Sequence, residues 1–105
     1  MSYAIRAHPL VRKDLRAIAE LIADYAGPEV ARRKIAEIEA AVRALAVTPH
    51  KGTIRDEIAP GVRAIPAGRR GVVVFTVDDR SQIVLIYAIT YGGGDWMARV
   101  RRRNT

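Results

Sequence analysis

The chain has 105 residues, half of them apolar, and 18 Lys and Arg against 11 Asp and Glu give it a net charge of +7. This length predicts one domain spanning residues 1–105 with one modest core. The absence of cysteine excludes disulfides, thiolate metal ligands and a cysteine nucleophile. The longest largely apolar run has nine residues, far short of the roughly 20 of a membrane helix. With no signal-peptide pattern at its start, the chain is expected to be cytoplasmic, with no membrane partner.

The positive charge is concentrated in the second half. Residues 51–105 carry ten Lys and Arg against five Asp and Glu, whereas residues 1–50 carry eight against six. A basic half indicates an acidic protein, a nucleic acid or a nucleoprotein as partner. The plainer interpretation, a soluble basic domain with no such partner, stays open.

The first half predicts a strand and a helix. Tyr3–Ala7 alternates apolar and polar residues and ends at His8, which the following proline holds extended. Pro9 suits the first turn of a helix. Asp14 is interpreted as part of a solvated surface, and His8 as a loop residue. The apolar stripe of this helix consists of Val11, Leu15, Ile18, Ile22 and Tyr25.

A second helix follows at once. Gly27 stops the first helix, Pro28 starts the second, and Thr48-Pro49 ends it. So short a connection predicts an antiparallel helical hairpin. Coiled-coil pairing with another chain stays open, although packing on a sheet is favoured. The second apolar stripe consists of Ala31, Ile35, Ile38, Val42 and Leu45.

The second half predicts three strands after a polar loop, 50–61, whose length suggests a function. Val72–Val77 and Ile83–Tyr91 flank the polar turn 78–81, the pattern of an antiparallel hairpin. Neither run alternates, so both faces are expected to be covered and both strands central. The third strand, Val62–Pro66, ends in a proline that places it near a sheet edge.

The predicted fold class is therefore α+β, in the order β-α-α-β-β-β, with the helical hairpin packed on a small antiparallel sheet. Residues 97–105 are interpreted as a basic, mobile tail.

No pattern for a reaction centre stands out. The carboxylates of Asp78 and Asp79 are interpreted as turn chemistry. The glycines at 92–94 precede Asp95 and Trp96 instead of the Gly-Lys-Ser/Thr of a phosphate loop. No cofactor and no metal are expected.

The arginines carry the functional prediction, because their planar forks bind carboxylates and phosphates. Trp96 lies among them and is suited to stack on a base or to anchor a protein. Solvated arginines and a tryptophan that caps the core stay open. The candidate target-binding residues are Arg63, Arg69, Arg70, Trp96, Arg99, Arg101, Arg102 and Arg103.

The chain resembles the toxins of the ParE/RelE superfamily of bacterial type II toxin–antitoxin systems, and the ParE branch more closely. The resemblance covers nearly the whole chain. It rests on the ordered set of segments: opening strand, helical hairpin, the Pro-Gly-Val-Arg-x-Ile-Pro-x-Gly-Arg segment at 60–69, Val72–Phe75, the Asp-Asp turn, the long last strand and Gly94-Asp95-Trp96.

This resemblance implies a twisted antiparallel sheet carrying a helical hairpin. It also implies a cognate antitoxin whose acidic, partly disordered C-terminal segment binds the toxin in a hetero-oligomer. Candidate antitoxin contacts are Val84, Ile86 and Tyr87.

The two branches differ in target. RelE-like toxins cleave mRNA on the ribosome with basic residues and a tyrosine, whereas ParE-like toxins poison DNA gyrase. Residues 71–75 lack the Tyr-Arg-x-x-Tyr of the RNase branch, and Tyr91 and Gly94 stand where that family often has His and Arg. A gyrase inhibitor that is not an enzyme is therefore expected. The alternatives are a ribosome-dependent RNase using Arg63, Arg69, Arg70 and Tyr91, or an inactive antitoxin-binding module.

Overall fold

The computed structural model describes residues 2–93 and 96–104, except for the side chains of Trp96 and Asn104. Its elements are β1 (Ala4–Ala7), α1 (Val11–Ala26), α2 (Pro28–Ala44), β2 (Thr53–Ile54), β3 (Arg63–Ala67), β4 (Gly71–Asp78), β5 (Ile83–Tyr91) and α3 (Trp96–Asn104). The predicted order is confirmed, with β2 and α3 as additions. No helix in this described part is long and apolar enough to cross a bilayer.

The five strands form one sheet in the order β1-β5-β4-β3-β2, in which β1 runs parallel to β5 and the other neighbours are antiparallel. The predicted hairpin, β4 and β5, is thus central. Asp78 Oδ1 accepts the N–H groups of Arg80 and Ser81, both at 3.1 Å, which confirms its role in the turn. Pro66 lies on β3 beyond its short pairing with β2, so its missing N–H leaves no ladder bond unmade there.

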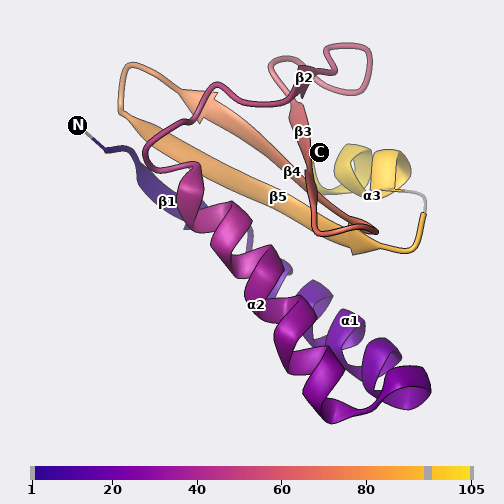
Figure 1. Cartoon of the computed structure of the whole chain (residues 1–105). Helices are drawn as coiled ribbons and strands as arrows, with labels where there is room; N and C mark the ends of the chain where they lie inside the picture. Colours follow the sequence, from indigo (N-terminus) through magenta and orange to yellow (C-terminus); the bar gives the residue numbers. More distant parts are fainter. Residues whose placement is uncertain (1, 94–95, 105) are drawn as a thin grey trace.

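Both faces of the sheet are covered (Figure 1). Val73 and Phe75 pack into a cluster with buried residues of α1 and α2, whereas Val74 packs into a second cluster with Val100 of α3. Alternate residues of a strand point to opposite faces, so β4 needs apolar residues at every position. This explains why the sequence of β4 does not alternate between apolar and polar residues.

Helix α3 corrects the interpretation of residues 97–105 as a mobile tail. Residues 96–104 are helical, and the side chain of Val100 is fully buried against the sheet. The run of arginines had suggested a solvated segment, but the face of α3 that carries Val100 has an apolar partner surface on β4 and β5.

The helical hairpin forms as predicted. Gly27 adopts φ 93° between the helices, and Pro28 occupies the first turn of α2. Tyr25, assigned to the apolar stripe, is instead 58% exposed. The stripe residues that are buried in the larger cluster are Val11, Ile18, Ile22, Ala31, Ile38 and Leu45.

Substitution of two glycines can test whether the loop 50–61 packs against β3. Both Gly52 and Gly61 have positive φ, 83° and 75°, but a Cβ on Gly52 would lie 2.4 Å from the Ala64 carbonyl oxygen, while Gly61 faces open space. Gly61→Ala should cost only the left-handed backbone penalty of about 1–2 kcal/mol. Gly52→Ala should cost roughly 1–3 kcal/mol more because of the overlap. Urea unfolding measures both, and equal losses would contradict the placement of this loop against β3.

Candidate functional site

Strand β5 continues beyond the end of its neighbour β1. The last pair between them joins Ala7 to Ile86, and β5 runs on to Tyr91. After β1, the His8 N–H donates to the Ile86 carbonyl at 2.8 Å and the chain turns into α1. Backbone groups on such an open strand edge need other partners when they are buried.

An ion pair supplies these partners. Asp14 Oδ2 accepts the Ile89 N–H at 3.0 Å, and Arg103 Nη1 donates to the Tyr87 carbonyl at 2.7 Å. Arg103 also holds both oxygens of Asp14, with bonds of 2.8 and 2.7 Å. Charged side chains from α1 and α3 therefore occupy the place of a strand at this edge.

A β-bulge at Tyr87 interrupts the pairing of β5 with β4. The register with β4 jumps from Val74–Ala88 to Phe75–Ile86, so Tyr87 is an extra residue on β5. A bulge leaves backbone groups without a ladder partner. Arg103 donates a hydrogen bond to the Tyr87 carbonyl and so replaces the missing ladder partner.

The interpretation of Asp14 as solvated is wrong. Its side chain is 6% exposed and that of Arg103 is 8% exposed. Asp14 follows Val11 by three residues and precedes Ile18 by four, which puts all three on one side of the helix. That spacing was the sequence signal for burial, and it was missed because an acidic residue is rarely buried without a partner.

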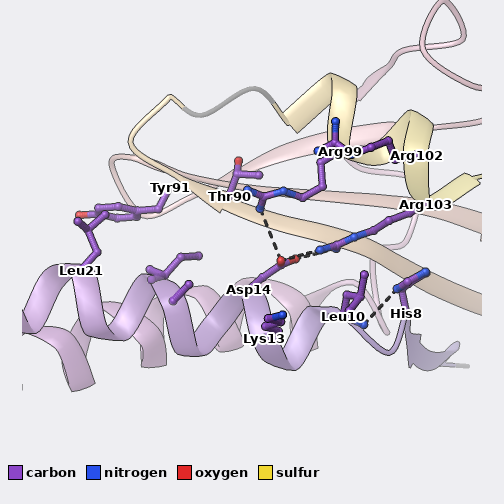
Figure 2. A pocket seen from close by; sticks show the side chains of 12 residues that line it. His8, Leu10, Lys13, Asp14, Leu21, Thr90, Tyr91, Arg99, Arg102 and Arg103 are labelled. Carbon is purple, nitrogen blue, oxygen red and sulfur yellow. Dashed lines mark hydrogen bonds and ion pairs between the residues drawn. The ribbon is translucent and has the colours of Figure 1, made fainter.

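Beside the ion pair lies a cavity of about 680 Å³ between α1 and α3. Figure 2 shows Asp14 below Arg99 and Arg103, with Leu21 and Tyr91 at one end and Leu10 and His8 at the other. We call this the α1–α3 groove. Its lining residues are His8, Leu10, Lys13, Asp14, Ala17, Ile18 and Leu21 from α1 and the turn before it, Thr90 and Tyr91 from β5, and Arg99, Arg102 and Arg103 from α3.

The two walls of the groove differ in character. The α1 wall combines the polar His8, Lys13 and Asp14 with four apolar residues, of which Leu10 and Leu21 are 42% and 50% exposed. The α3 wall is cationic. Arg99 reaches toward Asp14 at 3.5 Å and donates weakly to the Ile89 carbonyl at 3.4 Å.

Comparison with known proteins identifies the family. The model of the family described as "ParE toxin of type II toxin-antitoxin system, parDE" matches residues 5–96. The chain belongs to the ParE toxin family. No curated protein sequence matches it significantly.

Solved structures share the fold of this ParE-family chain. A chain of the chromosomal ParDE system from P. aeruginosa is 24% identical with a TM-score of 0.74, over 88% of this chain and 98% of that one. The RelBE2 toxin–antitoxin complex from Mycobacterium tuberculosis gives 18% and 0.63, over 88% and 100%. A free-state mutant of E. coli RelE gives 10% and 0.68, over 99% and 98%.

The groove gathers some of the residues that were predicted to bind a target. Arg99 and Arg102 line it, and Arg103 is committed to Asp14. Arg101 is exposed and does not line the groove. Trp96 begins α3, but its side chain lies outside the described part of the structure.

The candidate RNase residues do not meet at one point in this ParE-family chain. Arg63 donates to the carbonyls of His50 and Lys51 at 3.2 and 3.4 Å, about 13 Å along β3 from the turn that carries Arg69 and Arg70. Arg69 is exposed in that turn.

Two of these candidate RNase residues, Arg70 and Tyr91, do lie next to each other. The Arg70 guanidinium lies 5.5 Å from the centroid of the Tyr91 ring. The Tyr91 hydroxyl lies 3.3 Å from that of Tyr25, and this hydrogen bond, followed by burial, raises the pKa of Tyr91. A raised pKa moves a tyrosine away from use as a general base near neutral pH.

The candidate antitoxin contacts on β5 are largely internal. Val84 and Ile86 are fully buried in the larger cluster, under the helical hairpin. They present no surface to a partner in this structure. Tyr87 is half-buried.

A second polar cluster lies at the turn between β4 and β5. Asp79 Oδ1 accepts the Tyr3 hydroxyl at 2.7 Å and lies 2.6 Å from His50 Nε2. Asp79 therefore joins the start of β1 and the loop after α2 to this turn, beyond the turn chemistry predicted for it. The Tyr3 bond, and then the His50 bond, hold the pKa of Asp79 below its ordinary value of 3.8.

The buried ion pair should dominate stability at the β5 edge. Asp14→Ala leaves Arg103 buried without its partner and the Ile89 N–H without an acceptor, so unfolding free energy should fall by about 3–5 kcal/mol. Asp24→Ala, an exposed site on the same helix, should change it by less than about 0.5 kcal/mol. The double variant Asp14→Ala/Arg103→Met should lose less than Asp14→Ala alone. Denaturant unfolding measures all three, and a harmless Asp14→Ala would contradict this role.

The Asp79 cluster predicts a pH dependence. Tyr3→Phe removes the largest cause of the lowered pKa, so the Asp79 pKa should rise toward its ordinary value in an NMR titration. Because the folded pKa is the lower one, the cluster contributes stability above the unfolded carboxyl pKa of about 3.9, and this is lost as pH falls through the folded value. An Asp79 pKa that is the same in Tyr3→Phe and in the parent would refute the assignment.

Proposed function

We propose that this chain is a toxin that inhibits DNA gyrase without being an enzyme, and that a cognate antitoxin neutralises it by direct binding. The observation that carries the proposal is the match of the ParE toxin family over residues 5–96. The chain acts by binding other macromolecules in the cytoplasm. No cofactor takes part.

The arrangement of basic residues supports binding over catalysis. Arg63 is engaged with loop carbonyls, and Arg70 lies over Tyr91 at the other end of β3. An RNase requires a base, an acid and a phosphate-binding cation within reach of one scissile bond. The exposed Arg69 and Arg101 are instead spread over the surface, an arrangement suited to steering toward a large, negatively charged nucleoprotein.

The antitoxin partner follows from the type of system. The related structures from P. aeruginosa and Mycobacterium tuberculosis are toxin–antitoxin assemblies by their own descriptions. A chain of net charge +7 associates fastest with an acidic segment. We therefore propose a hetero-oligomer in which the antitoxin contributes an acidic, partly disordered C-terminal segment.

Purified protein added to gyrase and relaxed plasmid should abolish supercoiling and accumulate cleaved DNA. The control is a topoisomerase of another class, whose activity should not change. Unaffected gyrase at a molar excess of folded protein would contradict the proposed target. Codon-phased mRNA cleavage on ribosomes would favour the RNase alternative, and harmless expression without an antitoxin would favour an inactive binding module.

A further inference from the structure

We propose that a small cavity beside the β4–β5 turn binds a guanine base, with Arg63 on the acceptor edge of the base and Asp79 on its donor edge. The cavity shares no lining residue with the α1–α3 groove. Arg63 begins β3, so the cavity also lies at the opposite end of that strand from the turn with Arg69 and Arg70. The inference goes beyond the proposed gyrase inhibition and does not depend on it.

The size and walls of the cavity suit one flat ring system. Its volume is about 170 Å³, which is what about six water molecules occupy in the liquid. Ile54 of β2 and Val77 of β4 line it, and Ile54 is 51% exposed. Apolar walls with a few charged groups are typical of sites for small planar ligands with polar edges.

Arg63 brings a half-buried cation to this cavity. Its Nη1 donates to the carbonyls of His50 and Lys51 at 3.2 and 3.4 Å, which holds the guanidinium in place. Its Nε and Nη2 donate to no residue in the described part of the chain. A guanidinium carries five N–H donors in a fixed fork, so the remaining donors can bind two neighbouring acceptors of a ligand.

Asp79 brings a carboxylate of which only one oxygen is engaged. Its Oδ1 accepts the Tyr3 hydroxyl at 2.7 Å and lies 2.6 Å from His50 Nε2, whereas Oδ2 accepts nothing from the described residues. The lowered pKa of Asp79, caused first by the Tyr3 bond and then by the His50 bond, keeps this carboxylate ionised near neutral pH. An ionised carboxylate accepts hydrogen bonds and donates none, so this wall needs a ligand with donors.

The opposite charges of Arg63 and Asp79 line one cavity without closing an ion pair. The charge of Arg63 contributes to the lowered pKa of Asp79, yet the ion-pair partner of Asp79 among the described residues is His50. A ligand that accepts hydrogen bonds on one edge and donates them on the next bridges this gap. Such a ligand satisfies the cation and the carboxylate at once, and its ring needs no net charge.

Guanine has both edges in one plane. Its O6 and N7 accept an arginine fork, and its N1–H and N2–H₂ are neighbouring donors that a carboxylate accepts together. Adenine, cytosine and uracil each offer a single donor group on the corresponding edge. A base shows this edge only when it is unpaired, so the ligand is a free guanine nucleotide or a guanine in a single strand.

Positive charge is available for the phosphate of the same nucleotide. Lys51 and Arg80 follow directly after the lining residues His50 and Asp79, and both are exposed. Cations beside a binding cavity raise the local concentration of an anionic ligand. The affinity for a nucleotide should therefore fall with rising salt.

The test uses the full chain and guanosine monophosphate in isothermal titration and amide NMR. Shifts should map to His50, Ile54, Arg63 and Asp79. Inosine monophosphate differs only by the missing N2–H₂ group and should bind about tenfold or more weakly, as expected for a lost bond to a charged acceptor. Adenosine monophosphate should bind more weakly again.

Variants separate recognition from folding. Arg63→Lys keeps the charge but removes the fork, and it should weaken binding about tenfold or more, as should Asp79→Asn. Tyr3→Phe breaks the tie between Asp79 and β1 but keeps the carboxylate, so it should bind as the parent does. Arg33→Lys, the same change at an exposed arginine on α2, should also bind as the parent does. Circular dichroism checks that each variant is folded.

Oligonucleotides distinguish the two sources of the base. Single-stranded RNA and DNA with one guanine among uracils or thymines are titrated beside the free nucleotide. Tighter binding of a strand assigns the site to single-stranded nucleic acid, and equal or weaker binding assigns it to the free nucleotide.

Four results would overturn the proposal: no binding of guanosine monophosphate or of the guanine-containing strands, equal binding of inosine monophosphate, unchanged binding by Arg63→Lys or Asp79→Asn, or amide shifts elsewhere. Guanine binding by a chain that leaves gyrase unaffected would reject the proposed target and keep the cavity. Gyrase inhibition by a chain that binds no guanine would reject the cavity and keep the target.

Discussion

The ion pair between Asp14 and Arg103 holds the second half of this structure to the first. The two residues are 89 positions apart, and between them they satisfy two backbone groups on β5. Burying two charges costs several kcal/mol in lost hydration. That cost is offset here because both oxygens of the carboxylate are held, and because the alternative is an open strand edge with buried, unpaired N–H and C=O groups.

The local elements were predictable because their causes are local. Apolar residues three and four apart predicted both helices, and Gly27-Pro28 predicted the break between them. The polar turn that begins at Asp78 predicted the central hairpin of β4 and β5. Strand β2 has only two residues, too few for a pattern. Helix α3 was missed because its stability depends on Val74 and Asp14, which lie far from it in sequence.

The site was predictable only in part, since equivalent arginines have different roles. Arg103 is buried in an ion pair, Arg99 lines a groove, and Arg63 binds loop carbonyls. Nothing in a basic sequence distinguishes these roles, because each depends on a residue that folding brings near. The same holds for Asp14. Its spacing in the sequence places it on the buried face of α1, but it can be buried only because Arg103, 89 positions away, pairs with it.

The device that fixes the fold also sets the charge of the groove. Arg103 neutralises Asp14, the one carboxylate among the described lining residues, and by anchoring α3 it keeps Arg99 opposite α1. If α3 left the sheet, the wall would be lost and the β5 edge would lose its partners together. A ligand that needs both walls binds only the docked form, and it must therefore stabilise α3 by mass action. Partner recognition and the integrity of the C-terminal helix are in this way one coupled equilibrium.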